Sequence, residues 1–514
     1  EPPLRAVLFS ADQMERHGRT LAESHRLTPA RGPDLLLARL ADNGEVLAGA
    51  CELLTQAVKA NRRITPAGDW LLDNFYLIEE QIRIARRHFP KGYSRELPLL
   101  ANGTSAGLPR VYDIALEAIS HGDGRVDPES LNRFVAAYQK TGDLRLGELW
   151  AIPIMLRLAL IENIRRVGNR IAAGIIDRNR ANYWADEMLD VADKDPKSLI
   201  LVIADMARSN PPLVNSFVAE LARRLQGHSS ALALPLTWIE QRLGESGLTI
   251  EALVQSETQS QAANQVSISN SIGSLRLLAA IDWREFVESM SAVEQKLRED
   301  PDGIYAQMDF GTRDRYRHVI EKIARHSVLS ESDVARKAIQ LAHQGKAQKG
   351  EGGSERKAHV GYYLIDKGLP ELERSAEAHF SPLERLRRFD SLGRRVPLLL
   401  YLGSITLLTS AITGCFILMA ASSGLTGWLL AVTGIAAILG ASQLAMTLVN
   451  WLATLLASPQ LLPRMDFSRG IPAPARTLVV VPTMISSRQS VEELVEALEV
   501  RFLANRDPNL HFGL

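Results

Sequence analysis

The stretch that decides the fold is VPLLLYLGSITLLTSAITGCFILMAASSGLTGWLLAVTGIAAILGASQLAMTLVNWLATLLASPQLLP, which spans Val396–Pro463. It contains no Lys, Arg, Asp or Glu, although these residues make up 23% of the chain. A helix that crosses a bilayer needs roughly 20 apolar residues. Val396–Ala421 and Leu425–Val449 each provide that length, on either side of the turn Ser422-Ser423-Gly424. The stretch therefore predicts a hairpin of two transmembrane helices rather than a buried hairpin of a soluble protein.

Basic residues on both sides of this hairpin predict its orientation, because Lys and Arg concentrate in the cytoplasmic segments next to membrane helices. The turn between the helices carries no charge. Trp428 and Trp451 lie near helix ends, where indole rings favour the membrane interface. Both large flanks are therefore predicted to be cytoplasmic. The flanking arginines are Arg385, Arg387, Arg388, Arg394 and Arg395 before the hairpin, and Arg464, Arg469 and Arg476 after it.

Composition excludes some partners and some chemistry. The 514 residues include 59 basic and 59 acidic side chains, so no net charge favours nucleic acid. The two cysteines, Cys51 and Cys415, cannot build a disulfide framework, which fits a reducing compartment. The chain opens with Glu-Pro-Pro and has no basic-then-apolar signal peptide. We therefore expect either a processed start or a piece of a longer protein.

The segment 1–300 has apolar residues at helical spacing and no alternating pattern of the kind that predicts strands. Thr65-Pro66 predicts a helix start, because Thr caps a first turn and Pro is favoured at its first position. Glu148–Arg166 is the most apolar helix, but its short apolar run and the charge of Arg157 exclude a membrane span. An all-α domain is therefore predicted. The helix that starts at Thr65-Pro66 carries apolar residues at helical spacing from Trp70 to Ala85 and is expected to stop at Pro90. Further helices are expected at Val111–Ile119, Pro128–Gln139, Ala181–Asp193, Pro196–Arg208, Leu213–Leu225, Trp238–Leu243 and Asp282–Glu299.

A second soluble segment, 301–395, leads to the membrane. Helices are predicted at Met308–Ser327 and near Glu331–His343. Gly345–Gly353 is rich in Gly, Lys and Gln and predicts a flexible loop. His359–Gly368, with the sequence HVGYYLIDKG, predicts a short strand or extended segment.

These soluble segments contain no specific catalytic constellation. Glu79, Glu80 and Glu162 lie in helices beside arginines, and ion pairs that orient packed helices are favoured over acid–base catalysis. The eleven histidines lack metal-ligand spacing, so no metal ligands and no catalytic residues are predicted. The charged and aromatic cluster Asp309–Arg317 could bind an anion or a sugar, although a salt-bridged helix start is favoured.

The end of the chain changes the class of structure. Leu478–Val481 is a continuous apolar run, typical of a strand buried on both faces. Ser490–Glu493 is a capping box that predicts a helix ending near Asn505, and Leu510–Leu514 begins a second strand. This β-α-β order predicts parallel strands. An open pair of parallel strands is expected to expose apolar edges and faces.

Ligands of such sheets bind beyond the carboxyl ends of the strands. Pro482 and Thr483 follow the first strand directly and occupy that position. They are therefore either binding residues or a structural strand end, and spacing alone leaves both interpretations open.

Six long segments, occurring in one order, form a specific set. They are WLLDNFYLIEEQI (70–82), GYSRELPLL (92–100), GELWAIPIMLRLALIENIRR (147–166), MDFGTRDRYRHVIEKIA (308–324), HVGYYLIDKG (359–368) and VVVPTM with EELVEALEVRFLANRDPNLHFGL (479–514). Together they resemble the amino-terminal part of bacterial cyclic β-1,2-glucan synthases. The resemblance implies a very large inner-membrane protein that joins a family-84 glycosyltransferase to further membrane helices and a glycoside-phosphorylase-like region.

The same resemblance implies partners and a site. The family builds a β-1,2-glucan from UDP-glucose, so UDP-glucose, the growing glucan, the lipid bilayer and the rest of the synthase are the expected partners. In its transferase fold the end of the first strand lies against the uridine, which here is Pro482 and Thr483. A divalent cation, Mg²⁺ or Mn²⁺, is expected for the complete transferase domain, with no identifiable ligand in this chain. By itself this chain is predicted to be inactive.

The predicted fold class is mainly α. The expected parts are a helical cytoplasmic domain (1–300), a helical and loop segment (301–395), a transmembrane hairpin (396–457, spans 396–421 and 425–449), a linker (458–476) and the first β-α-β of a truncated GT-A-like nucleotide-sugar fold (477–514). The helical domain is expected to be a scaffold that packs on the rest of the synthase. The alternative is a membrane-tethered helical scaffold or sensor without catalysis. Transport is disfavoured because the two spans carry no ionisable group.

Overall fold

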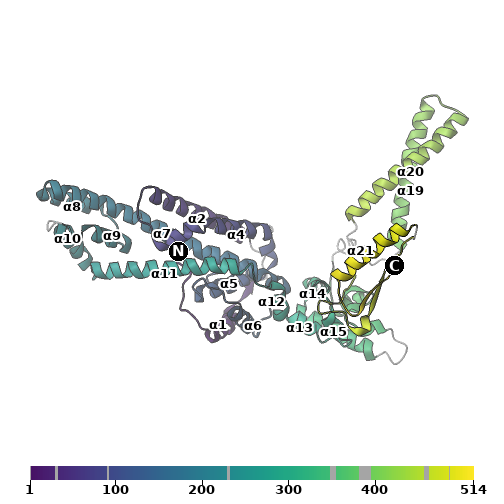
Figure 1. Cartoon of the computed structure of the whole chain (residues 1–514), viewed down its shortest axis with the longest axis horizontal. Helices are drawn as coiled ribbons and strands as arrows, with labels where there is room; N and C mark the ends of the chain where they lie inside the picture. The colour runs from purple at the N-terminus through teal and green to yellow at the C-terminus, as the bar shows by residue number, and fades with distance from the viewer. Residues whose placement is uncertain are drawn as a thin grey trace. The chain divides into compact units, whose positions relative to one another are not determined.

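The computed structural model describes residues 2–28, 33–89, 92–228, 232–347, 355–380, 395–456, 462–484 and 487–513. The chain divides into two compact units, Glu1–Glu294 and Gln295–Leu514 (Figure 1). The described residues are mainly helical, as predicted.

The N-terminal unit is built from helices. In chain order these are α1 (Ala11–Ser24), α2 (Leu35–Lys59), α3 (Pro66–Asp73), α4 (Phe75–His88), α5 (Arg110–His121), α6 (Pro128–Gln139), α7 (Leu146–Lys194), α8 (Leu199–Ser209), α9 (Asn215–Leu225), α10 (Ala233–Gly244), α11 (Ile250–Leu277), α12 (Trp283–Met290) and α13 (Ala292–Leu297), the last of which contains the division between the units. The two-residue strands β1 (Leu27–Thr28) and β2 (Leu99–Leu100) pair antiparallel.

The predicted helix starts at Thr65 and Pro128 are confirmed. The Thr65 hydroxyl accepts from the Gly68 amide at 3.3 Å, and α6 begins at Pro128 behind the cap of Asp127. The single helix predicted across Trp70–Ala85 is wrong, because α3 ends and α4 begins at Asn74.

The 49-residue helix α7 is the central element of this unit, and α11 runs beside it (Figure 1). Separate helices were predicted at Glu148–Arg166 and Ala181–Asp193, and this is wrong because one helix spans both. Val167, Ile171 and Ile175 continue the apolar spacing between them and are buried. Gly168 lets α2 approach, since a Cβ there would lie 3.3 Å from Leu47 Cδ2.

Helix α11 was missed by the sequence analysis because polar side chains interrupt the apolar residues on its buried face. Ser267, Ser271 and Ser274 are buried, and Asn163 of α7 donates to the hydroxyls of Ser267 and Ser271 at 3.0 and 3.1 Å. Small hydroxyl side chains permit a close approach of helices while their hydrogen-bonding groups stay satisfied. A reading based on apolar periodicity does not detect such a face.

The second unit contains a helical part, an apolar hairpin and a small α/β part. Its elements are η4 (Tyr305–Gln307), α14 (Phe310–Arg325), α15 (Glu331–Ala347), η6 (Glu355–Ala358), α16 (Gly361–Ile365), α17 (Leu369–Ser375), α19 (Arg395–Ser422), α20 (Trp428–Leu456), η8 (Ala473–Ala475), β3 (Thr477–Val480), α21 (Arg488–Ala504) and β4 (Leu510–Gly513).

The strand or extended segment predicted at His359–Gly368 is wrong, because the middle of this segment forms α16. Aromatic and β-branched residues suggested a strand. The carboxylate of Asp300 instead holds the start of the helix, accepting from the Val360 amide at 2.9 Å and from His359 Nδ1 at 2.8 Å. The loop predicted at Gly345–Gly353 begins inside α15 and otherwise lies outside the described residues.

Helices α19 and α20 form the predicted hairpin and are each long and apolar enough to cross a membrane. The turn contains Gly424 and Gly427, both with positive φ, which glycine adopts without steric cost. The second helix begins at Trp428 and ends at Leu456, rather than at the predicted Leu425 and Val449. Tyr401 Oη donates to Asn450 Oδ1 at 2.6 Å and links the two helices.

Strands β3 and β4 pair in parallel, with Thr477 opposite Leu510 and Val480 opposite Gly513, so the predicted β-α-β order is confirmed. The predicted cap at Ser490 is wrong. Ser487 caps α21, its hydroxyl accepting from the Ser490 amide at 3.2 Å, and Asn505 ends the helix as expected.

Candidate functional site

Pro482 and Thr483 lie directly beyond the carboxyl end of β3, where the sequence predicted a binding position. The Val481 amide donates to the Gly513 carbonyl at 3.0 Å, so the strand pairing continues up to these two residues. Pro482 is exposed and Thr483 is half-buried. Both are therefore accessible at the edge where parallel α/β sheets bind ligands.

The prediction that β3 is buried on both faces is wrong for this chain. Leu478 is 62% exposed and Val480 is 56% exposed. Two strands and one helix cannot cover both faces of a sheet, so the expectation of exposed apolar faces holds. An open hollow of about 430 Å³ between α21 and β4 is part of this exposed surface, lined by Val495, Leu498, Glu499, Phe502, Leu510, His511 and Phe512.

Asp507 is the only aspartate in the segment 477–514, and its carboxylate is engaged in local structure. One oxygen accepts from the Asn509 amide and the other from the Ile471 amide, both at 2.8 Å. This carboxylate therefore holds the turn before β4 against the linker.

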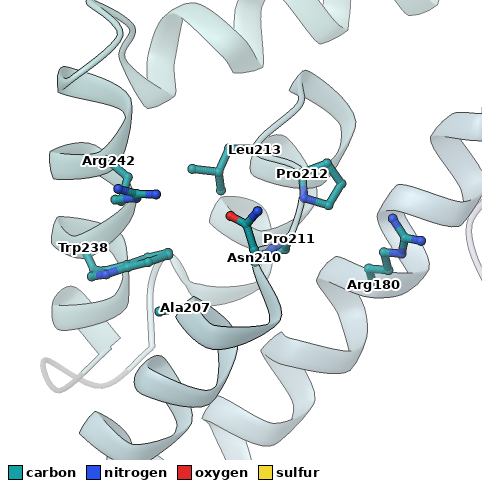
Figure 2. Close-up of a pocket in the computed structure, with 8 residues that line it drawn as sticks. All are labelled: Arg180, Ala207, Asn210, Pro211, Pro212, Leu213, Trp238 and Arg242. Atoms are coloured by element: carbon teal, nitrogen blue, oxygen red, sulfur yellow. The ribbon is translucent and has the colours of Figure 1, made fainter.

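A second hollow, of about 710 Å³, lies in the N-terminal unit (Figure 2). Figure 2 shows Trp238 and Arg242 on one helix wall, Asn210 and the two prolines after it on a loop, and Arg180 on α7 across from them. An indole face and guanidinium donors can contact a sugar ring or an anion. Sequence analysis did not select these residues, because they come from separate helices and follow no motif.

Glu162, a candidate acid or base from the sequence, is completely buried. Its two oxygens accept five hydrogen bonds of 2.8–3.1 Å, which come from Arg39 (two), Asn43, Arg165 and Arg166. Burial alone raises the pKa of Glu162, but the hydrogen bonds from Arg39 and Arg166 outweigh burial and hold it well below its usual value. A carboxylate saturated in this way is a structural ion pair, the favoured interpretation of the sequence.

The cluster Asp309–Arg317 is likewise the start of a helix. Asp309 caps α14 by accepting from the Thr312 amide at 2.9 Å. Arg317 is fully buried, pairs with Asp314 at 3.1 Å and lies over the Phe310 ring. Burial, with the nearby charge of Asp300, raises the pKa of the buried Tyr316 to about 12. The favoured interpretation, a salt-bridged helix start, is therefore confirmed.

Cys51 is buried in α2, and burial, reinforced by the charge of Glu79, raises the pKa of its thiol to about 12. A thiol reacts as its thiolate, so Cys51 is not a nucleophile in the folded chain.

We expect native Cys51 to resist alkylation at pH 8 and to react at once in denaturant, as measured by mass spectrometry of tryptic peptides. Because the folded pKa lies above the ordinary value of 9.0, this group favours folding below about pH 9 and loses that contribution as pH rises toward 12. Equal labelling rates in the native and denatured chain would contradict the buried placement.

The described residues define a mainly helical protein with an apolar two-helix hairpin and a parallel β-α-β. No family model matches the chain. The chain is 34% identical, over 520 aligned positions and 99% of its length, to "Cyclic beta-(1,2)-glucan synthase NdvB" of Rhizobium meliloti (strain 1021). It spans 18% of the length of that protein. The resemblance to a cyclic β-1,2-glucan synthase, first drawn from the six sequence segments, is therefore confirmed.

Proposed function

We propose that this chain is the membrane-anchoring segment, and the beginning of the transferase domain, of a glucosyltransferase that builds β-1,2-glucan from UDP-glucose. The observation that carries the proposal is the similarity to a cyclic β-1,2-glucan synthase along 99% of the chain. The parallel pairing of β3 and β4 supports it, because nucleotide-sugar folds begin with such a unit. The finer parts of the proposal are a bilayer-spanning hairpin, a cytoplasmic transferase and a donor site at Pro482 and Thr483.

The exposure of the hairpin supports a membrane location. Large aliphatic side chains on both helices face outward, including Leu407 at 74% and Leu439 at 65% exposure. A soluble helical hairpin buries such residues against a core, whereas a bilayer solvates them. The backbone hydrogen bonds of both spans are made within the helices, as a hydrocarbon environment requires.

Contacts between the two flanks of the hairpin support their location on one side of the bilayer. The Asp309 amide donates to the Arg464 carbonyl at 2.9 Å, and the Asp466 amide donates to the Gln307 carbonyl at 2.8 Å. The Arg464 amide also donates to Thr312 Oγ1 at 3.0 Å. Residues before and after the hairpin are therefore paired directly, which an even number of spans allows. The arginines on these flanks support a cytoplasmic location of that side in a bacterial inner membrane.

A cytoplasmic transferase has direct access to UDP-glucose, and a membrane anchor holds the growing glucan near the site, which raises its effective concentration. Pro482 and Thr483 would contact the uridine. A divalent cation, Mg²⁺ or Mn²⁺, is a proposed partner of the complete transferase domain. The phosphorylase-like region is a proposed partner that belongs to the rest of a synthase. A cation on the diphosphate would support departure of UDP.

We expect the isolated chain, purified in detergent and given radiolabelled UDP-glucose with Mg²⁺ or Mn²⁺, to form no labelled glucan. A longer protein that contains this segment should form it under the same conditions. Labelled glucan from the isolated chain would contradict the expected inactivity, and none from the longer protein would argue against the transferase itself.

The donor position can be tested in that longer protein with Thr483→Glu. A carboxylate beside the uridine and diphosphate should raise KM for UDP-glucose by about tenfold or more, equivalent to about 1.4 kcal/mol of binding. Thr477→Glu is the matched control, because Thr477 is exposed at the opposite end of the same strand. Equal KM values for the two variants would remove the end of β3 from the donor site.

A further inference from the structure

Three side chains that could ligate a metal ion converge at the end of α5, in the N-terminal unit. Glu117 and His121 lie one turn apart on this helix, and His17 comes from α1. His17 Nε2 is 2.8 Å and His121 Nε2 is 3.3 Å from the same carboxylate oxygen, Glu117 Oε2. All three ligand atoms lie within 4.8 Å of one another. Sequence spacing did not reveal the group, because His17 is 100 residues away from Glu117.

The backbone around His121 determines which of its ring nitrogens faces the group. His121 Nδ1 is 2.7 Å from the Val7 carbonyl, which can only accept, so Nδ1 carries a proton. The carbonyl is itself held in place, because the Ala6 amide donates to the Ser120 carbonyl and the Phe9 amide to the His121 carbonyl. A backbone carbonyl on the far ring nitrogen is the usual outer partner of a metal-binding histidine.

This protonation leaves Nε2 of a neutral His121 with a lone pair directed toward a carboxylate oxygen. Two acceptors at 3.3 Å repel each other unless a positive charge lies between them. Either a second proton or a metal cation supplies that charge. The C-terminal end of α5, with its partial negative charge, favours a cation of either kind at this place.

The packing around the two histidines and the partial exposure of the group also suit a metal. Phe9 stacks on the His121 ring with centroids 3.7 Å apart, which limits rotation of the ring. Next to His17, Gly18 allows close packing of α1 on α6, since a Cβ there would lie 2.7 Å from the Phe134 carbonyl oxygen. His17 and Glu117 remain 23% and 31% exposed, which leaves an entry path and room for a water ligand.

We propose that His17, Glu117 and His121 bind a divalent first-row transition metal, of which Zn²⁺ is the best fit, and that the metal clamps residues 6–24 to α5. Two imidazoles and one carboxylate with an open fourth position are a known zinc donor set. Tetrahedral ligands at about 2.1 Å from zinc lie about 3.4 Å apart, so small side-chain adjustments close the site. Imidazole nitrogen disfavours Mg²⁺ and Ca²⁺, so this site is distinct from the cation expected for the transferase.

The test uses the tag-free full chain in detergent, with the metal alone as the probe. We expect one Zn²⁺ or Co²⁺ per chain by elemental analysis and titration, with a visible absorption band for bound Co²⁺ and no binding of Mg²⁺ at this site. Zn²⁺ should slow amide hydrogen exchange in residues 6–24.

Two variants separate a specific site from loss of fold and from adventitious histidine binding. His17→Ala with His121→Ala should lower Zn²⁺ affinity by more than about a hundredfold, beyond the 10–100-fold cost of losing an outer hydrogen-bond partner. Glu117→Gln keeps the side-chain shape and should also weaken binding and abolish the effect on hydrogen exchange.

The matched control is His318→Ala with His326→Ala, which removes the same number of histidines from α14 and its C-cap and should bind as the unmodified chain does. Equal Zn²⁺ affinity in the control and in the site variants would overturn the proposal. Absence of Zn²⁺ or Co²⁺ binding by the unmodified chain would overturn it as well.

Discussion

Replacing Glu162 with alanine is expected to produce a large loss of stability in the N-terminal unit. The change leaves Arg39, Arg165 and Arg166 around a buried site with no carboxylate, and their side chains are only 34%, 14% and 15% exposed. Removing one partner of a buried ion pair costs about 3–5 kcal/mol, because the remaining charges are left uncompensated. Arg39 lies on α2 and Glu162 on α7, so the loss should appear in both helices.

Hydrogen exchange of the full chain, followed by mass spectrometry, measures this loss locally. We expect peptides of α2 and the first half of α7 to exchange about a hundredfold or more faster, from the relation of about 1.4 kcal/mol per factor of ten. Asp190→Ala is the control, because Asp190 forms an exposed pair with Lys194 on the same helix. If Glu162→Ala exchanged like the control, the five-bond cluster would not stabilise the packing of α2 on α7.

The contribution of Glu162 to stability should depend on pH in a definite direction. The folded pKa of Glu162 lies below its ordinary value of 4.5, so its contribution is complete above that pH and is lost as the pH falls. Slow exchange in α2 should therefore weaken below about pH 4.5 in the unmodified chain. Glu162→Gln, which cannot titrate, should show a smaller change over the same range.

Placing one arginine in the middle of each hairpin helix, as Leu407→Arg with Leu439→Arg, is expected to abolish stable membrane association. Each arginine near the centre of a span costs about 2.5–3.5 kcal/mol on insertion scales, so the pair costs about 5 kcal/mol or more. The test discriminates clearly, because both leucines are already exposed. In a water-exposed hairpin the same substitutions would be neutral and would improve solubility.

Membrane pellets washed with alkaline carbonate, followed by immunoblotting, measure the outcome. The unmodified chain should stay in the pellet and the double variant should be released or degraded. Leu478→Arg is the control outside the hairpin, at a leucine that is 62% exposed, and it should stay in the pellet. Retention of the double variant, or release of the unmodified chain, would contradict a hairpin that spans the bilayer.

Features that depend on neighbouring residues could be predicted from the sequence. The uncharged run at 396–463 predicted the hairpin because lipid requires about 20 apolar residues per span whatever the tertiary structure. The caps at Thr65 and Asn505 and the β-α-β order of 477–514 followed from local backbone chemistry. Boundaries were less reliable, as the cap at Ser487 shows, because serines at 487 and 490 offer alternative starts of one helix.

Burial and pairing across distant segments needed the tertiary structure. The buried serines of α11 could not be recognised from apolar periodicity. Their burial depends on hydrogen bonds from Asn163 of α7 and on the close approach of the two helices. His359–Gly368 resembled a strand locally, and the carboxylate of Asp300 decided in favour of a helix. The exposed β3 shows the converse, since an apolar strand is buried only where other elements cover it.

The sequence by itself determined the lipid-length hairpin, the helical class and the likeness to a glucan synthase, since each depends on composition or on continuous motifs. Only the tertiary structure decided that Glu162 is a saturated ion pair, that His17 meets Glu117 and His121, and that Arg464 is paired with the segment before the hairpin. The physical reason is that charges and hydrogen bonds act over a few ångströms. Residues a hundred positions apart must be brought together by packing before their chemistry exists.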